Sequence, residues 1–165
     1  MLKIERIAAS QGALLKDLRC WALADAPYAF SGTLAEAAGR SDESWATSAA
    51  HLAHDQRSTT FIGYYNGQPC GMMGCYLLGE NDNTANLVAV WVAPECRKLK
   101  VGQGLLEAIK GWARESNAQV LHAWVAEQNL SAIGFYKSAG FQVSGERQPF
   151  KSDASQEEIL LTLQL

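Results

Sequence analysis

The sequence predicts an α/β fold of the α+β type, in which helices cover one sheet, and three observations lead to this expectation. The chain has 165 residues, of which 48% are hydrophobic. This length is sufficient for one continuous hydrophobic core and short for two domains. Apolar runs typical of strands flank Asn66-Gly67, a dipeptide that tolerates the positive φ angles of a tight hairpin turn. From Gly104 onward the hydrophobic period becomes helical. We therefore expect one domain over residues 1–165.

The N-terminal third is predicted to contain one strand and three helices. Residues 1–6 alternate apolar and charged side chains, as a strand does and a signal peptide does not. Residues 10–24 carry apolar side chains at spacings of three and four, which predicts an amphipathic helix that ends before Pro27. Thr33 with Glu36 fits a capping box for a short second helix. The apolar stripe of the first helix comprises Leu14, Leu15, Leu18, Trp21 and Ala22, and Ser41 or Asp42 is the expected cap of the third helix.

The remaining two thirds alternate between strand and helix patterns. The run at residues 85–92 is apolar on both faces, as expected for a central strand that is covered on each side. Gly140 follows a short helical segment at the position where a left-handed residue ends a helix. The expected strands are residues 59–65, 71–78, 85–92, 119–126, 141–147 and 157–165, and the expected helices are residues 104–115 and 131–138.

Composition excludes several classes of protein. A formal charge of −3 and a pI near 5.6 give no general attraction for nucleic acid. No apolar run approaches the roughly 18 residues of a membrane span. We therefore expect a cytoplasmic protein that binds neither nucleic acid nor membrane. The cysteines show no CxxC pair and no histidine at ligand spacing, so reduced thiols are predicted and no metal site; they are Cys20, Cys70, Cys75 and Cys96.

The segment 92–106 has the composition of an anion-binding turn. A buried strand leads into a short basic loop and then into a helix whose first turn contains Gly102 and Gly104. Unpaired N–H groups and the helix dipole at such a start can bind phosphate. An ordinary strand-to-helix turn, with glycines for close packing, is the plainer interpretation. A dinucleotide site is disfavoured, because the third glycine and the acidic residue about 20 positions further on are missing.

Two motifs resemble those of the GNAT acetyltransferases. In the first, Arg97 and Gly102 match the outer positions of the family pattern, and Lys100 replaces its inner glycine. In the second, every position is filled, by Asn129, Ala132, Tyr136 and Gly140-Phe141. The resemblance covers residues 59–165 well. It implies a mixed, mostly antiparallel sheet of six to seven strands with splayed central strands and about four helices on its faces.

The resemblance also implies acetyl-CoA as co-substrate and Tyr136 as the general acid that protonates the departing thiolate. A phenol with a pKa of about 10 stays protonated at neutral pH; packing against Ala132 and Phe135 is the alternative role. The pantetheine arm is expected along the backbone of residues 90–92, and backbone groups after the fifth strand could polarise the thioester. The implied cofactor contacts are Val90, Trp91, Val92, Arg97, Lys98, Leu99, Lys100, Val101, Gly102, Gln103, Gly104, Asn129 and Tyr136.

The general base and the acceptor amine are not identified by the resemblance. Many relatives place a glutamate near the position of Asn86, which cannot act as a base. Glu80, Asp82, His122 and Glu127 stay as candidates, although each is also explained as a solvated loop charge or a strand residue. Polyamine, amino sugar, amino acid and protein N-terminus all stay open as acceptors. Side chains that would suit a cationic amine, or form an ordinary helix edge, are Asp25, Tyr28, Phe30, Asp42, Glu43 and Trp45.

The leading hypothesis is therefore an N-acetyltransferase that moves an acetyl group from acetyl-CoA to a primary amine of a small molecule or peptide. The amine attacks directly, without a covalent enzyme intermediate, since no cysteine occupies the motif positions. A non-catalytic acyl-CoA-binding or regulatory module is the alternative, favoured by Asn86 and disfavoured by Tyr136. A third hypothesis is an interaction protein that dimerises through an exposed edge strand. Under the leading hypothesis, too, the protein could form a homodimer.

Overall fold

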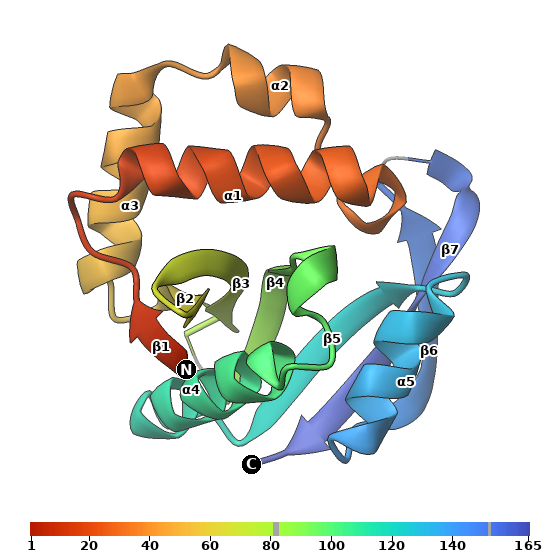
Figure 1. Ribbon diagram of the computed structural model, residues 1–165. Helices are drawn as coiled ribbons and strands as arrows, with labels where there is room; N and C mark the ends of the chain where they lie inside the picture. The colour runs from red at the N-terminus through yellow and green to blue at the C-terminus, as the bar shows by residue number, and fades with distance from the viewer. Residues whose placement is uncertain (81–82, 152) are drawn as a thin grey trace.

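The computed structural model describes residues 1–80, 83–151 and 153–165, and these residues form one seven-stranded sheet. The strand order is β1-β2-β3-β4-β5-β7-β6 (Figure 1). All neighbouring strands are antiparallel except β4 and β5, so the predicted mixed, mostly antiparallel sheet is confirmed. The strands are β1 (Leu2–Arg6), β2 (Ser58–Tyr65), β3 (Gln68–Leu78), β4 (Thr84–Val92), β5 (Val120–Ala126), β6 (Gln142–Phe150) and β7 (Asp153–Gln164).

Helices cover both faces of the sheet. In Figure 1, α1, α2 and α3 lie above the sheet, and α4 and α5 lie below it. Within the described residues no helix is long and apolar enough to cross a membrane. The helices are α1 (Gly12–Asp25), α2 (Leu34–Gly39), α3 (Asp42–His54), α4 (Val101–Glu115) and α5 (Leu130–Ser138), with 3₁₀ turns η1 (Pro27–Ala29) and η2 (Pro94–Cys96).

Several local predictions are confirmed by the backbone. Asn66 and Gly67 have φ angles of 49° and 81°, as a tight hairpin turn between β2 and β3 requires. Thr33 caps α2 by accepting a hydrogen bond from the N–H of Glu36, and Ser41 caps α3 in the same way. Local sequence signals are therefore sufficient to position these turns and helix ends.

Two details differ from the sequence prediction. Helix α4 begins at Val101, three residues before Gly104, because Lys100 takes a left-handed conformation (φ 66°) that ends the preceding loop. Val101 is then buried against the sheet, with 1% of its surface exposed. Trp21 is 46% exposed and does not belong to the buried stripe of α1, which is formed instead by Leu15, Leu18, Ala22 and Leu23.

The sheet opens between β4 and β5. The two strands pair only over residues 84–86 and 120–122, and beyond these residues they separate. In the separated part, the pairing of β4 with β3 is interrupted by an irregularity, and Ala89 has a positive φ of 53°. An extra residue of this kind bends a strand and changes the direction of its backbone groups. The predicted splay of the central strands is therefore confirmed, and it opens the sheet at its centre.

Candidate functional site

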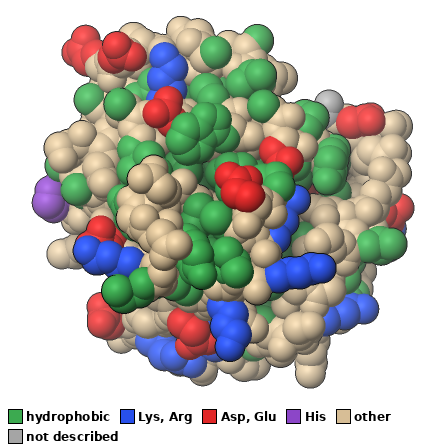
Figure 2. All heavy atoms as spheres, in the orientation of Figure 1, with side chains coloured by type: hydrophobic (Ala, Val, Ile, Leu, Met, Phe, Trp, Pro, Cys, Tyr) green, Lys and Arg blue, Asp and Glu red, His purple; other side chains and the backbone are tan. Residues whose placement is uncertain are grey.

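A cleft passes through the sheet where β4 and β5 separate. It consists of three adjoining cavities that share Ala29 and Phe30 in their walls. The middle cavity is lined by residues 87–90 of β4, residues 123–126 of β5, and by Tyr136 and Glu158. One neighbouring cavity adds Trp91 and Arg97, which are among the expected cofactor contacts, and is called the cofactor-side cavity. The other adds Arg19 and Tyr76 and is called the acceptor-side cavity, because the acceptor is expected opposite the cofactor. Figure 2 shows basic side chains on the surface between η2 and α5, beside hydrophobic side chains below α1.

The loop from η2 to α4 leaves the start of a helix open. Lys100, the N-cap of α4, offers no side-chain acceptor to the first turn, and the first intrahelical bond runs from the Gly104 N–H to the Lys100 carbonyl. The preceding N–H groups of the helix are thus free to bind an anion. Lys98 and Lys100 are exposed, and neither forms an ion pair within the described part of the chain.

The side chain of Arg97 does not project toward an open anion site. Its Nη2 lies 2.6 Å from Asp25 Oδ2, and its Nε donates to the Val92 carbonyl oxygen at 3.0 Å. Trp91 Nε1 donates to the same Asp25 oxygen at 3.0 Å. The hydrogen bond from Trp91, followed by that from Arg97, lowers the pKa of Asp25 below its ordinary value. Asp25 is therefore engaged with the cofactor-side loop instead of facing an acceptor amine.

The glycines of this segment also have a packing role. A Cβ on Gly102 would lie 3.1 Å from the Phe135 ring, and one on Gly104 would lie 3.1 Å from Ile4. Close packing, the plainer interpretation of these glycines, is thus correct for both residues. It does not exclude anion binding, because these contacts involve the Cα positions of the two glycines, whereas an anion would bind the backbone N–H groups of the first turn.

Tyr136 is held rigidly at the middle of the cleft. Its ring makes edge contacts with Phe135 and Phe141, at centroid distances of 5.3 and 5.1 Å, and the residue is 5% exposed. Burial raises the pKa of the Tyr136 phenol, so the hydroxyl stays protonated. Phe141 N–H donates to the Tyr136 carbonyl at 3.0 Å, in a helix ending that requires the positive φ of Gly140. The packing role and an acid role are therefore compatible.

The side-chain amide of Asn129 has its oxygen in a hydrogen bond and its nitrogen available to donate. Its Oδ1 caps α5 by accepting a hydrogen bond from the N–H of Ala132 at 3.2 Å. The Nδ2 donors have no acceptor among the residues that the structure describes. Asn129 lines both the middle cavity and the cofactor-side cavity. The predicted amide contact to the cofactor therefore has an available donor.

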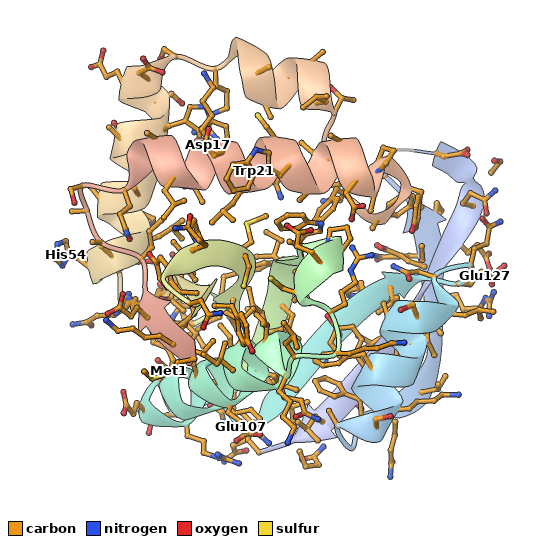
Figure 3. The ribbon with its side chains drawn as sticks, in the orientation of Figure 1. Met1, Asp17, Trp21, His54, Glu107 and Glu127 are labelled. Atoms are coloured by element: carbon orange, nitrogen blue, oxygen red, sulfur yellow. The ribbon has the colours of Figure 1, made fainter. Side chains whose placement is uncertain are left out.

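The candidate bases from the sequence do not meet in the cleft. Glu80 is exposed on its loop, and Asp82 lies outside the described residues. His122 lies in β5 between Asn86 and Thr162, and it lines none of the three cavities. Glu127 forms an ion pair with Arg147 at the outer edge of the molecule, as Figure 3 shows for its position.

A carboxylate that sequence reasoning missed does line the cleft. Glu158 of β7 is 8% exposed and contributes to the middle and acceptor-side cavities. Gln148 Nε2 donates to its Oε1, and no Lys or Arg pairs with it in the described ranges. The alternation of side chains along the strand could have indicated that Glu158 faces the interior. Glu158 lies two residues before Leu160, which is 1% exposed, and alternate residues of a strand share a face.

Asn86 has a structural role. Its Nδ2 donates to Tyr76 Oη at 3.1 Å and to the Leu87 carbonyl at 3.2 Å, and the residue is buried in the wall of the acceptor-side cavity. Because a carbonyl oxygen can only accept, the Leu87 contact fixes the orientation of the amide. The side chain joins β3 to β4 beside the opening of the sheet.

Comparisons with known proteins agree with this architecture. The profile described as "Acetyltransferase (GNAT) family" matches residues 15–141. An uncharacterized N-acetyltransferase of Methanocaldococcus jannaschii is 28% identical over 86 residues, a segment that covers 50% of this chain and 38% of that protein. The chain thus spans well under half the length of this relative.

Solved structures show the same fold. An acetyltransferase of the GNAT family from Streptococcus pneumoniae has a TM-score of 0.80 at 18% identity, over 100% of this chain and 99% of that one. The Salmonella typhimurium protein yncA, solved with acetyl-CoA, has a TM-score of 0.78 at 18% identity, over 100% and 94%. The PaiA N-acetyltransferase of Thermoplasma acidophilum, solved with coenzyme A, has a TM-score of 0.75 at 15% identity, over 100% and 99%. By the extent of the profile match, the chain belongs to the GNAT acetyltransferase family.

Proposed function

We propose that this chain is an N-acetyltransferase that moves an acetyl group from acetyl-CoA to a primary amine by direct attack. The observation that carries the proposal is the cleft through the sheet, in which Tyr136 and Glu158 line one cavity. The strand pairing gives Glu158 the same face as Asn86 and Tyr76, whereas α5 with Tyr136 packs on the opposite face, where Gly140 approaches Leu163. A thioester and an amine entering from opposite faces would meet between them.

The cofactor side would act mainly through its backbone. The open N–H groups at the start of α4 would bind the phosphates, and Lys98 and Lys100 would add positive charge. The unpaired edge of β4 at residues 90–92 would bind the pantetheine amides as an added strand does. Asn129 would donate its free Nδ2 hydrogens. Relatives solved with coenzyme A or acetyl-CoA support the choice of cofactor.

The chemistry requires that the nitrogen loses two protons and that the sulfur gains one. Glu158 would accept a proton from the bound ammonium, so that the neutral amine can attack the acetyl carbonyl carbon. As the new C–N bond forms and the C–S bond breaks, the electron pair leaves with sulfur, and the nitrogen gives up its second proton to solvent in the cleft. Tyr136 would donate its phenolic proton to the sulfur as the thiolate develops, and would then regain a proton from solvent. Both groups are largely buried, at 5% and 8% exposure.

A non-catalytic acyl-CoA-binding module was favoured by Asn86 alone, and Glu158 supplies the carboxylate that Asn86 cannot. The two functions are separated by thiol release from acetyl-CoA across a library of primary amines. Thermal unfolding with and without acetyl-CoA provides the parallel measurement, because a ligand of the native state raises the melting temperature. We expect both stabilisation and amine-dependent thiol release. Stabilisation without release from any amine would establish the binding module instead.

A further inference from the structure

Beyond Glu158, the acceptor side of the cleft continues into a pocket with two arginines. The acceptor-side cavity has a volume of about 210 Å³. A second cavity of about 310 Å³ lies beside it, under α1 and α3, and Arg19, Tyr76, Val88 and Ala89 line both. Arg40 lines the second cavity, and no residue in its wall is acidic. Among the described residues, Glu158 is the acidic residue of the connected space. Arg19 and Lys151 line the same cavity as Glu158, and Arg40 lines the second cavity.

Arg19 is a half-buried cation without an anionic partner. Its guanidinium lies 5.6 Å from the centre of the Phe30 ring, and it forms no ion pair with any described residue. Burial, and then the charge of Arg40, lower the pKa of Arg19. Both effects mean that the positive charge is unfavourable where it lies. A buried charge is normally paired, because its desolvation is otherwise uncompensated.

Arg40 completes this cationic pocket. Its guanidinium lies 3.8 Å from the centre of the Trp45 ring and donates to the hydroxyls of Ser44 and Ser48. No carboxylate among the described residues pairs with it. Trp45, which is 3% exposed and lines the same cavity, has an indole N–H without an acceptor. Two guanidinium groups that line one cavity, neither of them paired with a described carboxylate, form a site that lacks an anion.

We infer that the acceptor is a small amine that carries a second, anionic group, which binds Arg19 and Arg40 while the amine lies at Glu158. The anionic group is a carboxylate or a phosphate, so the substrate class is amino acids or aminoalkyl phosphates. Polyamines do not fit, because their further ammonium groups would meet arginines instead of carboxylates, and an amino sugar without an acidic group would leave the arginines unpaired. The inference rests on the proposed N-acetyltransferase function, of which it specifies the substrate.

Matched acceptors test the inference directly. Linear ω-amino carboxylates of increasing length are compared with their carboxamides, which keep the amine and lose the charge, and with aminoalkyl phosphates of the same lengths. We expect kcat/KM to be at least about tenfold higher for the best charged acceptor than for its neutral counterpart, as charge-assisted hydrogen bonds to arginine imply. The chain length of the acceptor with the highest kcat/KM measures the distance between Glu158 and the arginines. The series with the higher kcat/KM, carboxylates or phosphates, identifies the anionic group.

Variants assign the effect to the pocket. Arg19→Gln is expected to lower kcat/KM for the charged acceptor by roughly 10- to 100-fold and to change that for the carboxamide little. Arg19→Lys keeps part of the preference, and Arg40→Gln lowers it less, because Arg40 is exposed. Arg114→Gln, on the exposed side of α4, serves as control and leaves both values unchanged.

The outcomes separate this inference from the function on which it rests. Thiol release with carboxamides or diamines that equals or exceeds that with charged acceptors would overturn the substrate class and leave the acetyltransferase in place. Equal losses for charged and neutral acceptors in both Arg19→Gln and Arg40→Gln would also overturn it. An absence of thiol release with every amine tested, despite acetyl-CoA binding, would reject the proposed function and the inference with it.

Discussion

The two sides of the cleft are built in different ways. The side where we propose that the cofactor binds comes from two short stretches, residues 90–104 and residues 129–136. It offers mainly backbone groups, namely an open helix start and an unpaired strand edge. The acceptor side is assembled from side chains of α1, β3, β4, β6 and β7, which lie far apart in the sequence. A site made of backbone groups would tolerate a changed side chain, such as Lys100 at the position of a glycine in the family pattern. A site made of side chains would tolerate few changes.

The largest expected effect concerns the point where the two sides meet. Tyr136→Phe removes the hydroxyl and keeps the ring between Phe135 and Phe141, so kcat should fall by about 100-fold or more. The KM for acetyl-CoA should change little, because the backbone site is intact. Steady-state kinetics measure both, with Tyr65→Phe in the hairpin as control. Unchanged turnover in Tyr136→Phe would show that the Tyr136 hydroxyl is not the general acid.

Glu158→Gln tests the acceptor side of the cleft, where side chains are proposed to act on the amine. We expect kcat/KM for the amine to fall by about 100-fold at neutral pH, and to recover as pH rises and the free amine becomes more abundant. Acetyl-CoA should stabilise the variant as it does the parent. Glu157→Gln is the matched control, since Glu157 is exposed and pairs with Arg147 on the other face of β7. A pH profile that only shifts downward, without recovery, contradicts a base at Glu158.

Ala89→Val tests whether the backbone of the opened strand matters. Ala89 has a φ of 53°, which a β-branched residue adopts poorly, so we expect a loss of about 2 kcal/mol in the free energy of unfolding. Acetyl-CoA affinity should fall as well. Ala89→Gly, which accepts this φ, should be close to neutral. Denaturant unfolding measures the first quantity and a titration with acetyl-CoA the second; equal stability of the two variants would show that the bulge relaxes freely.

A pair of glycines in α4 gives an internal comparison. At Gly111 a Cβ meets nothing within 4 Å, so Gly111→Ala should raise stability by about 0.5–1 kcal/mol through helix propensity. At Gly102 the Cβ would lie 3.1 Å from Phe135, so Gly102→Ala should gain less. Its side chain also lies at the open helix start, and acetyl-CoA should bind roughly tenfold more weakly. Equal acetyl-CoA affinity in the two variants would place the phosphates elsewhere.

The smallest effect is expected at Asp25, where the two sides of the cleft are joined. The pKa of Asp25 is lowered from its ordinary 3.8, so its contribution to stability is present above that pH and is lost as pH falls through the lowered value. Asp25→Asn should therefore be slightly less stable than the parent at neutral pH, and the difference should disappear in acid. Unfolding curves across this range measure it. A difference that persists in strong acid, where the carboxylate is protonated in both the folded and the unfolded state, would exclude the carboxylate as its origin.

The backbone groups that we propose to bind the cofactor could be located from the sequence because the segments that carry them are contiguous. The hairpin at Asn66-Gly67, the loop before α4 and the capped helix α5 are each specified by neighbours in the chain, whose turn and capping chemistry acts over a few residues. The acid candidate Tyr136 was implied by the resemblance of residues 129–141 to the second GNAT motif, in which Asn129 and Gly140 also match. What the sequence determined by itself is therefore this local framework and the order of its elements.

Only the tertiary structure decided which charges face the cleft. Glu158 and Arg19 are separated by most of the chain, and they line one cavity because β7 pairs with β5 and α1 crosses the same face of the sheet. Glu127, by contrast, forms an ion pair with Arg147 at the edge of the molecule, and the side chain of Arg97 forms an ion pair with Asp25. Strand pairing and ion pairing act across space, so spacing along the chain does not report them, whereas turns and helix caps depend on residues a few positions apart.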